Sequence, residues 1–369
     1  MRILIVTYGM QSWNQHLLPW IYIKNLNEHF NKIAGFSSSI LNLNSTYECE
    51  SKKIICLTDS AKKNYDVVFY PIDWSLKSFT LPIRSDRKIA YFPGSIFRLR
   101  DYLGAFRLYE VKKIAQYGLH LLNRKLLEAG IGQLPDDTDQ IICFSRFNAE
   151  YLSSRLPGAK ISVAPPFHNS DEIDTIRHAV SNSRRNDYFL FCGSPFSERG
   201  FFDLLKLKAI LSQNSDGPVI KFLIRVDENV NHHKTRKICK KFECSNFIFE
   251  FNEVRREKLL SEIALCQALL LPFRVVPCEV PLAAYECYAL GNLVISTNVN
   301  GFSMLNSDLG INIPESNPQL MVDAMKFILE NPKDAQAMRN ASELFIKESK
   351  GWDAFNTFFE DICRSSVVH

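Results

Sequence analysis

The sequence lacks the patterns that usually identify a nucleotide or metal site. It contains no GxGxxG and no GxxxxGK[ST] segment, and no two of its ten cysteines form a CxxC pair. The common dinucleotide, ATP and zinc fingerprints are therefore absent. The closest cysteine pairs, Cys49 and Cys56, Cys239 and Cys244, and Cys278 and Cys287, do not suggest the disulfide framework of a small secreted domain. We therefore expect free thiols in a reducing compartment.

Long hydrophobic runs are also missing. The first residues, MRILIVTYGM, hold only a short β-branched run, which is shorter than a signal-peptide core. No later window reaches the roughly eighteen uncharged apolar residues that a spanning helix needs. These absences predict a cytoplasmic protein, and they leave peripheral contact at the inner face of the membrane as an open option.

What the sequence does contain is a globular composition with an uneven charge. Its 369 residues are 46% hydrophobic and 23% charged, and this length favours two domains of roughly 150–200 residues each. Residues 1–170 hold 21 Lys and Arg against 14 Asp and Glu, whereas the remainder holds 23 against 26. A basic first half suits an anionic partner, although ordinary surface variation produces similar differences.

Apolar runs alternate with amphipathic stretches along the chain. In the first half the runs that predict strands are ILIV (3–6), DVVFYPI (66–72), KIAYF (88–92), QIICF (140–144) and KISVAPP (160–166). After a polar break at 168–187 the alternation restarts with YFLFCG (188–193), VIKFLIRV (219–226), NFIFEF (246–251), ALLLPF (268–273) and NLVIST (292–297). Strands that alternate with helices predict parallel βαβ units. We therefore expect an α/β fold with two Rossmann-like, doubly wound domains facing a central cleft.

The break sets the expected domain boundaries. We place an N-terminal domain at 1–170, a C-terminal domain at 187–348 and a final helical segment at 349–369. Ligands of such sheets bind beyond the carboxyl ends of the strands. The loops after residues 6, 92, 144, 193, 226, 273 and 297 are therefore the places to look for chemistry.

The first loop of the second half, FCGSPFSERGFFDLL, has the composition of an anion site. Gly193 permits a tight turn at the strand end, and Ser194 and Arg199 follow before a helix. Backbone N–H groups at a helix start, together with a nearby cation, suit phosphate. The alternative is a plain connecting turn that carries a surface arginine.

The segment PFRVVPCEVPLAAYECYALGNLVISTNVNG places two acids around a helix start. Pro281 suits the first turn of a helix, and the following amides, including those of Leu282 and Ala283, would favour an anion. Glu279 precedes the helix, and Glu286 lies inside it among apolar residues. A buried carboxylate there requires a partner. The alternative is that Glu279 caps the helix and Glu286 is solvated on its surface.

This segment resembles the donor site of GT-B glycosyltransferases of the GT4 type. FCGSPFSERGFFDLL is similar to the family's phosphate loop, and ICFSRFNAEYLSSRLPGAKISVAPPF resembles the end of its first domain. The resemblance implies a retaining glycosyltransferase that needs neither metal nor cofactor, with the nucleotide sugar on the second domain and the acceptor on the first. It also implies that the final helix crosses back to the first domain.

The resemblance also assigns roles to individual residues. The diphosphate would lie on Arg199, with Gly193 and Ser194 in the same loop, and on the amides of Leu282 and Ala283. Glu286 would bind the ribose and Glu279 the sugar, and Arg199 and Glu279 would be the catalytic pair.

Several positions depart from the family's pattern. Counting eight residues back from Glu286 reaches Cys278, and the acid here, Glu279, is seven back. One of the two diphosphate cations falls on Ser194, so Arg225 or Arg274 would have to replace it. The first-domain histidine falls on Pro93, whereas His16 and His120 lie in helical contexts that favour a structural role.

The acceptor is indicated only by charge. Residues 104–128 form an amphipathic stretch with a basic side, preceded by Arg84, Arg87, Lys88, Arg98 and Arg100. Such a surface suits an anionic membrane or a lipid-diphosphate acceptor, and the alternative is a core helix with a solvated face. Nucleic acid is not expected, because no recognisable binding module is present.

The predicted function is therefore transfer of a sugar from a nucleotide sugar to an acceptor hydroxyl, in the synthesis of a glycan, a glycolipid or a surface polysaccharide. Two alternatives stay open. An inactive GT-B homologue could serve as a binding or regulatory partner, and a sugar-nucleotide epimerase would share the two-domain fold.

Overall fold

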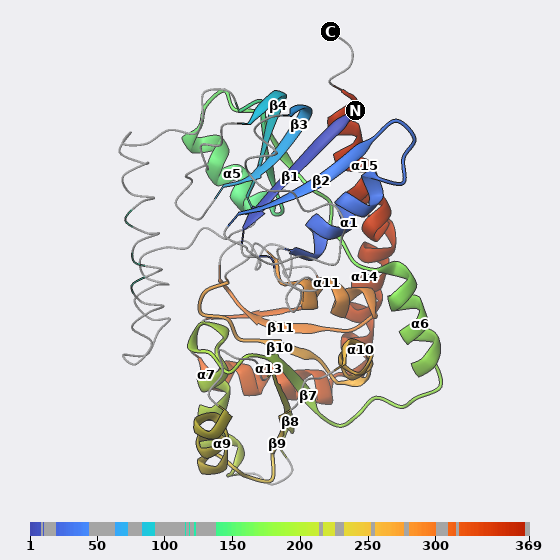
Figure 1. Cartoon of the computed structure of the whole chain (residues 1–369). Helices are drawn as coiled ribbons and strands as arrows, with labels where there is room; N and C mark the ends of the chain where they lie inside the picture. Colours follow the sequence, from blue (N-terminus) through green and yellow to red (C-terminus); the bar gives the residue numbers. More distant parts are fainter. Residues whose placement is uncertain are drawn as a thin grey trace.

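The structure is a computed structural model that contains two parallel β-sheets, one above the other in Figure 1. It describes residues 1–8, 10, 20–43, 63–72, 83–92, 115, 118, 122, 138–213, 217–225, 232–251, 255–276, 280–299, 309–314 and 317–365. Within these residues, no helix combines the length and the apolar character needed to cross a membrane.

The first sheet has the strand order β2-β1-β3-β4-β5-β6, and all its neighbouring strands are parallel. Its strands are β1 (Arg2–Tyr8), β2 (Ser37–Leu43), β3 (Asn64–Pro71), β4 (Arg84–Phe92), β5 (Gln140–Cys143) and β6 (Ile161–Val163). Helices α1 (Trp20–Phe30) and α5 (Arg146–Arg155) belong to this domain. The central strands contain buried apolar runs, such as ILIV in β1 and IAYF in β4, because both faces of the sheet are covered there.

The second sheet has the strand order β12-β11-β10-β7-β8-β9, again all parallel. Its strands are β7 (Phe189–Gly193), β8 (Ile220–Ile224), β9 (Phe247–Phe251), β10 (Leu269–Leu271), β11 (Val294–Thr297) and β12 (Ile311–Ile313). Counted from β7, this is the order 3-2-1-4-5-6 of a dinucleotide-binding sheet, and the direction of winding reverses between β7 and β10.

Short helices connect the strands of the second sheet. They are the 3-10 turn η2 (Ser197–Arg199), α7 (Phe201–Lys206), α8 (Lys208–Leu211), α9 (His232–Lys241), α10 (Arg256–Leu265), α11 (Leu282–Ala289) and α13 (Pro318–Glu330). The two-domain α/β architecture predicted from the alternating pattern is confirmed.

The polar break between the sheets contains a helix, α6 (Ser170–Val180). The Asn169 side chain caps it by accepting a hydrogen bond from the Glu172 amide at 3.3 Å. Only Ile173 and Ile176 of this helix are buried. Helix α6 packs against α10, so the connection between the sheets belongs to the surface of the second domain.

The chain ends in two long helices, α14 (Pro332–Ser349) and α15 (Gly351–Arg364), and α15 lies against the first domain (Figure 1). Asn25 in α1 donates to the side-chain oxygen of Asn356 at 2.6 Å. Arg87 in β4 donates to the carbonyl of Ile362 at 2.8 Å.

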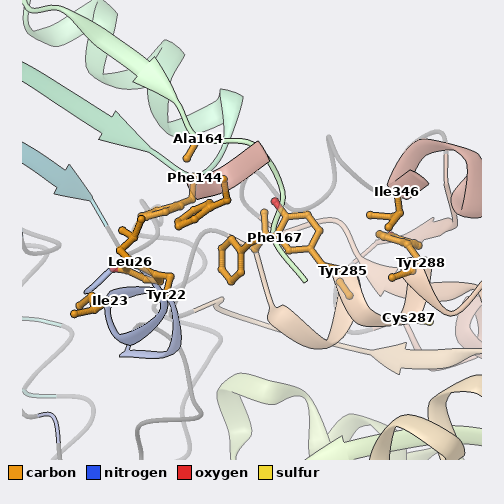
Figure 2. Packing of buried hydrophobic residues seen from close by; sticks show 14 of the residues in the cluster. Tyr22, Ile23, Leu26, Phe144, Ala164, Phe167, Tyr285, Cys287, Tyr288 and Ile346 are labelled. Carbon is orange, nitrogen blue, oxygen red and sulfur yellow. The ribbon is translucent and has the colours of Figure 1, made fainter. Parts of the chain in front are cut away.

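Aromatic side chains join the two domains. Phe167, in the connection after β6, packs on Trp352 of α15 and on Tyr285 of α11, with ring centroids 4.9 and 5.8 Å away. Phe355 of α15 completes the contact with a centroid 5.0 Å from Phe167. Figure 2 shows Phe167 between Tyr22 and Phe144 of the first domain and Tyr285 of the second. One hydrophobic core therefore runs through the domain junction.

The basic amphipathic stretch at 104–128 lies outside the described residues, except for Ala115, Gly118 and Leu122, which are helical. Of the five basic residues that precede it, the structure describes Arg84, which is exposed, together with Arg87 and Lys88. The membrane surface predicted for this region is not tested by these residues.

Candidate functional site

The predicted site residues surround the point where the winding of the second sheet reverses. Strands β7 and β10 are direct neighbours, with Leu190 beside Leu269. Because parallel strands place their carboxyl ends on one edge, the loops that follow Gly193 and Leu271 leave the sheet together. Open α/β sheets bind ligands in the crevice at such a reversal.

Gly193 and Arg199 lie in contact in the loop after β7. Gly193 has a φ of +137°, and a Cβ at this position would be 3.1 Å from Nη1 of Arg199. The backbone conformation thus favours glycine, and a side chain here would have to displace the Arg199 guanidinium slightly. The Arg199 guanidinium makes no hydrogen bond or ion pair within the described part of the chain, which leaves it available to an anionic ligand.

The loop after β7 is joined to the loop after β10. The carbonyl of Glu198 accepts hydrogen bonds from the amides of Arg274 and Val275 at 2.9 and 3.3 Å. At the start of α7, a Cβ on Gly200 would be only 1.7 Å from the carbonyl oxygen of Pro272. The two loops therefore pack backbone to backbone, and this contact holds Arg199 beside the segment that leads into α11.

The two residues considered as a second cation have different surroundings. Arg274 donates to both carboxylate oxygens of Asp203, at 2.5 and 2.6 Å, and thereby ties the β10 loop to α7. Arg225 follows β8, and its amide donates to the carbonyl of Gly193 at 3.0 Å. Arg225 is therefore the one whose backbone lies directly beside Gly193.

Helix α11 starts at this edge of the sheet. Pro281 is its N-cap residue, and the amide of Ala284 donates to the Pro281 carbonyl at 2.9 Å. Leu282 and Ala283 form the first turn and are half-buried. The first N–H groups of a helix have no partner inside the helix, so the amides of Leu282 and Ala283 can serve an anion. The next amide, that of Ala284, is already used in the bond to Pro281.

Glu286 is buried one turn further along α11, with 2% of its surface exposed. Its Oε1 accepts a hydrogen bond from Nη2 of Arg256 at 2.6 Å, and Nε of Arg256 donates to Oε2 of Glu172 at 2.8 Å. Burial raises the pKa of Glu286, and the charge and hydrogen bond of Arg256 oppose that rise. The partner that sequence reasoning required for this carboxylate is thus an arginine of α10, supported by a glutamate of α6.

Cys192, at the end of β7, is close enough to Arg199 and Glu286 for the charge of each to act on its thiol. Burial raises the pKa of its thiol to about 12; the charge of Arg199 lowers that pKa and the charge of Glu286 raises it. Both side chains therefore act on one sulfur atom, from the loop after β7 and from α11. Cys192 is a neutral thiol at physiological pH, and the seven described cysteines are all free.

Ser194 is buried in the same loop, and its carbonyl accepts from the amide of Phe196 at 2.8 Å. The structure thus brings together Gly193, Ser194, Arg199, Leu282, Ala283 and Glu286. Five residues named in the sequence analysis lie outside the described residues: Glu279, Cys278, Pro93, His16 and His120.

Among the residues that are described, no group of three or more His, Cys, Asp and Glu side chains has the arrangement of a metal site.

Comparison with known proteins gives one family match by sequence and many matches by fold. The family model of the glycosyl transferases group 1 matches residues 172–345. No curated protein sequence matches the chain.

Solved structures with the same fold cover both domains. A glycosyltransferase from Rickettsia africae is 12% identical, with a TM-score of 0.66 over 100% of this chain and 99% of that one. A sucrose-phosphate synthase from Thermosynechococcus elongatus is 13% identical, with a TM-score of 0.69 over 98% of each chain. Anabaena HepE, solved with UDP-glucose, is 9% identical, with a TM-score of 0.64 over 99% of this chain and 100% of HepE.

These matches confirm the resemblance that the motifs indicated. The fold of two six-stranded parallel sheets is that of the GT-B glycosyltransferases. Residues 172–345, which carry both loops and Glu286, match the family model of the glycosyl transferases group 1.

Proposed function

We propose that the protein transfers a glycosyl group from a nucleoside diphosphate sugar to an acceptor hydroxyl. The observation that carries the proposal is the convergence of Arg199, the start of α11 and Glu286 at the reversal point of the second sheet. A cation and two helix-start amides suit a diphosphate, and a carboxylate one turn away suits the hydroxyls of a ribose. The UDP and UDP-glucose bound by HepE are ligands of this kind.

Each group has a distinct role in the proposed reaction. Arg199 and the amides of Leu282 and Ala283 stabilise the negative charge that develops on the departing diphosphate. Glu286 orients the nucleoside through its ribose, and Glu279 binds the transferred sugar. The first domain positions the acceptor hydroxyl against the anomeric carbon. Retention of anomeric configuration, without a metal ion or a cofactor, is part of the proposal.

The proposed acceptor is a glycan or a lipid-linked molecule, and contact with an anionic membrane would bring the protein to the latter. Exposed basic side chains support such contact. Helix α9 exposes His232, His233, Lys234, Arg236, Lys237, Lys240 and Lys241 and contains no acidic residue. Cosedimentation with vesicles that contain phosphatidylglycerol, compared with phosphatidylcholine alone, tests this contact, and equal sedimentation with both would exclude it.

A thermal-shift panel of UDP-, GDP- and ADP-sugars tests the donor site. A ligand at about a hundredfold over its dissociation constant stabilises the folded protein by about 2.7 kcal/mol. We expect one nucleotide class to raise the melting temperature of the wild type and to lose that effect in Glu286→Ala. The control Glu257→Ala changes an exposed carboxylate of α10 and should retain the shift.

Absence of a shift with every nucleotide sugar, in a protein shown to be folded, would reject donor binding and favour an inactive homologue. Turnover of the nucleotide sugar without any acceptor would favour an epimerase instead.

A further inference from the structure

Three charged side chains from three helices form a row of two ion pairs that ends at the candidate donor site. Glu172 comes from α6, Arg256 from α10 and Glu286 from α11. The side chains of Glu172 and Arg256 are 26% and 30% exposed, whereas that of Glu286 is 3% exposed. Arg256 therefore bridges an outer carboxylate, near the surface, and an inner one at the site.

The contact uses only half of the inner carboxylate. Arg256 reaches Oε1 of Glu286, and no described residue forms a hydrogen bond or ion pair with Oε2. A charge-assisted bond at 2.6 Å fixes the position of one oxygen and thereby the direction of the other. The carboxylate is thus held in one orientation before any ligand arrives.

The arrangement also explains how Arg256 itself is held. Its Nε and Nη2 atoms donate to different carboxylates, so rotation of the guanidinium would break one of two bonds. Burial lowers the pKa of Arg256, but the charges and hydrogen bonds of Glu286 and Glu172 outweigh burial and raise it overall. Arg256 is consequently positively charged at neutral pH and in the titrations described below.

We propose that Arg256 is a positioning residue of the donor site: it binds Oε1 of Glu286 and so presents Oε2 to the ribose hydroxyls of the nucleotide, while Glu172 fixes Arg256 from the other side. This inference rests on the proposed function, since it needs a ribose at Glu286. The reacting atoms are not touched by Arg256, and its effect is exerted through Glu286.

Removal of Arg256 should make nucleotide binding depend on pH. The groups that act on Glu286 from the packed elements are Arg256, Glu172 of α6 and Cys192 of β7. Helix α14 also packs on α11, but its Glu343 lies beside Gly291, past the end of that helix. Arg256 holds the pKa of Glu286 down against burial. Without it the carboxyl protonates at a higher pH and accepts fewer hydrogen bonds.

Calorimetric titration of the full-length protein tests the proposal. The probes are UDP, GDP and ADP and their 2′,3′-dideoxy counterparts, measured at about pH 6 and about pH 8. We expect the wild type to bind one ribonucleotide about tenfold more tightly than its dideoxy form, as for a hydrogen bond to a charged group. Arg256→Gln should reduce that preference to about twofold and weaken binding further at the lower pH, because removal of Arg256 raises the pKa of Glu286 further and favours its protonated form.

Two further variants guard against simple misfolding. Arg256→Lys keeps the positive charge but not the planar set of guanidinium donors. It should recover part of the ribose preference that Arg256→Gln loses. Glu172→Gln leaves the Arg256–Glu286 pair intact, and its preference for the ribonucleotide should fall between those of the wild type and Arg256→Gln. The control is Glu257→Gln, at an exposed residue of α10, which should show the same ribose preference as the wild type.

The outcomes separate the two claims. A wild type that binds ribose and dideoxyribose nucleotides equally would overturn the ribose role of Glu286 and, with it, this inference. A wild-type preference that persists unchanged in Arg256→Gln and Arg256→Lys, with no new pH dependence, would overturn the role of Arg256 alone.

Discussion

Arg199 folds back over Gly193, so that a Cβ on the glycine would be 3.1 Å from the guanidinium nitrogen Nη1. The strand end and the cation of the candidate diphosphate site are therefore in direct contact. A side chain introduced at Gly193 should therefore change the position of the Arg199 guanidinium.

We expect Gly193→Ala to destabilise the protein by about 1–3 kcal/mol, the usual cost of a side chain at a strained backbone position. Because the added methyl group also displaces Arg199, nucleotide binding should weaken by about tenfold. Thermal unfolding and titration with the nucleotide sugar measure the two effects. Gly158→Ala is the control, since Gly158 also has a positive φ (+93°) but nothing within 4 Å of its Cβ position. An equal loss of binding in both variants would contradict the contact.

Arg199→Ala should lower nucleotide affinity by about tenfold to a hundredfold, the range for losing a hydrogen bond to a charged group. If Arg199 acts on the departing diphosphate, kcat should fall as well, and Arg199→Lys should recover part of both losses. Steady-state kinetics with the identified donor separates kcat from KM. Arg184→Ala removes a side chain that is 89% exposed and should change neither constant. Wild-type kinetics in Arg199→Ala would rule out the proposed role.

Asp203 should contribute stability that disappears in acid. Burial raises its pKa, but hydrogen bonds from Arg274 and Lys206 outweigh burial, and the pKa lies below its usual value. A lowered folded-state pKa means that the contribution is present above the unfolded pKa of about 4 and is lost as pH falls through the folded value. Asp203→Asn should therefore reduce the free energy of unfolding by about 1–3 kcal/mol at neutral pH, and by less below about pH 4.

Urea unfolding at neutral and acidic pH measures this difference. Asp187→Asn, at a carboxylate that is 84% exposed, should change stability at neither pH. A deficit of Asp203→Asn that stays constant from neutral to acidic pH would show that the pair with Arg274 is not its source.

Phe355→Ala should be among the more damaging substitutions in α15. Phe355 is fully buried, and its ring contacts Phe144 of the first domain and Phe167 of the interdomain connection. Removing such a ring costs about 3–5 kcal/mol, because a cavity is left behind. Phe358 of the same helix is half-buried, so Phe358→Ala should cost less. Guanidinium unfolding of both variants gives the comparison, and similar losses would show that the junction repacks around the missing ring.

Much of the fold could be predicted because the inner strands of both sheets contain short apolar runs, such as IAYF in β4 and FLI in β8. Of the four edge strands, β6 and β9 were predicted, whereas β2 and β12 were missed. Strand β2 begins with the serines of SSSILNL, and β12 has only three residues. The serines of β2 and the shortness of β12 leave too weak an apolar run to predict a strand. Helix α9, HHKTRKICKK, was missed for a similar reason, because only Thr235 and Cys239 of that helix are buried.

The candidate site also contains residues that could be predicted from the sequence and one that could not. Gly193, Arg199 and the start of α11 were predicted because each role depends on residues next to one another in the chain. Arg256 was missed, since it lies 30 residues before Glu286 and 84 after Glu172. In the sequence, RREK and SDEID look like ordinary solvated charges. Only the packing of α6, α10 and α11 brings Arg256 to the buried carboxylate of Glu286 and Glu172 to the other side of Arg256.

The contact between Phe167 and Tyr285 restricts how this protein can be recombined with its relatives. Tyr285 stands immediately before Glu286, and its ring meets the interdomain connection 5.8 Å from Phe167. A chimera that exchanges only residues 172–345 would bring a foreign α11 to a native Phe167 and a native α15. Exchange of the second domain should therefore give a stable protein only when the interdomain connection and the last helix are exchanged together with it.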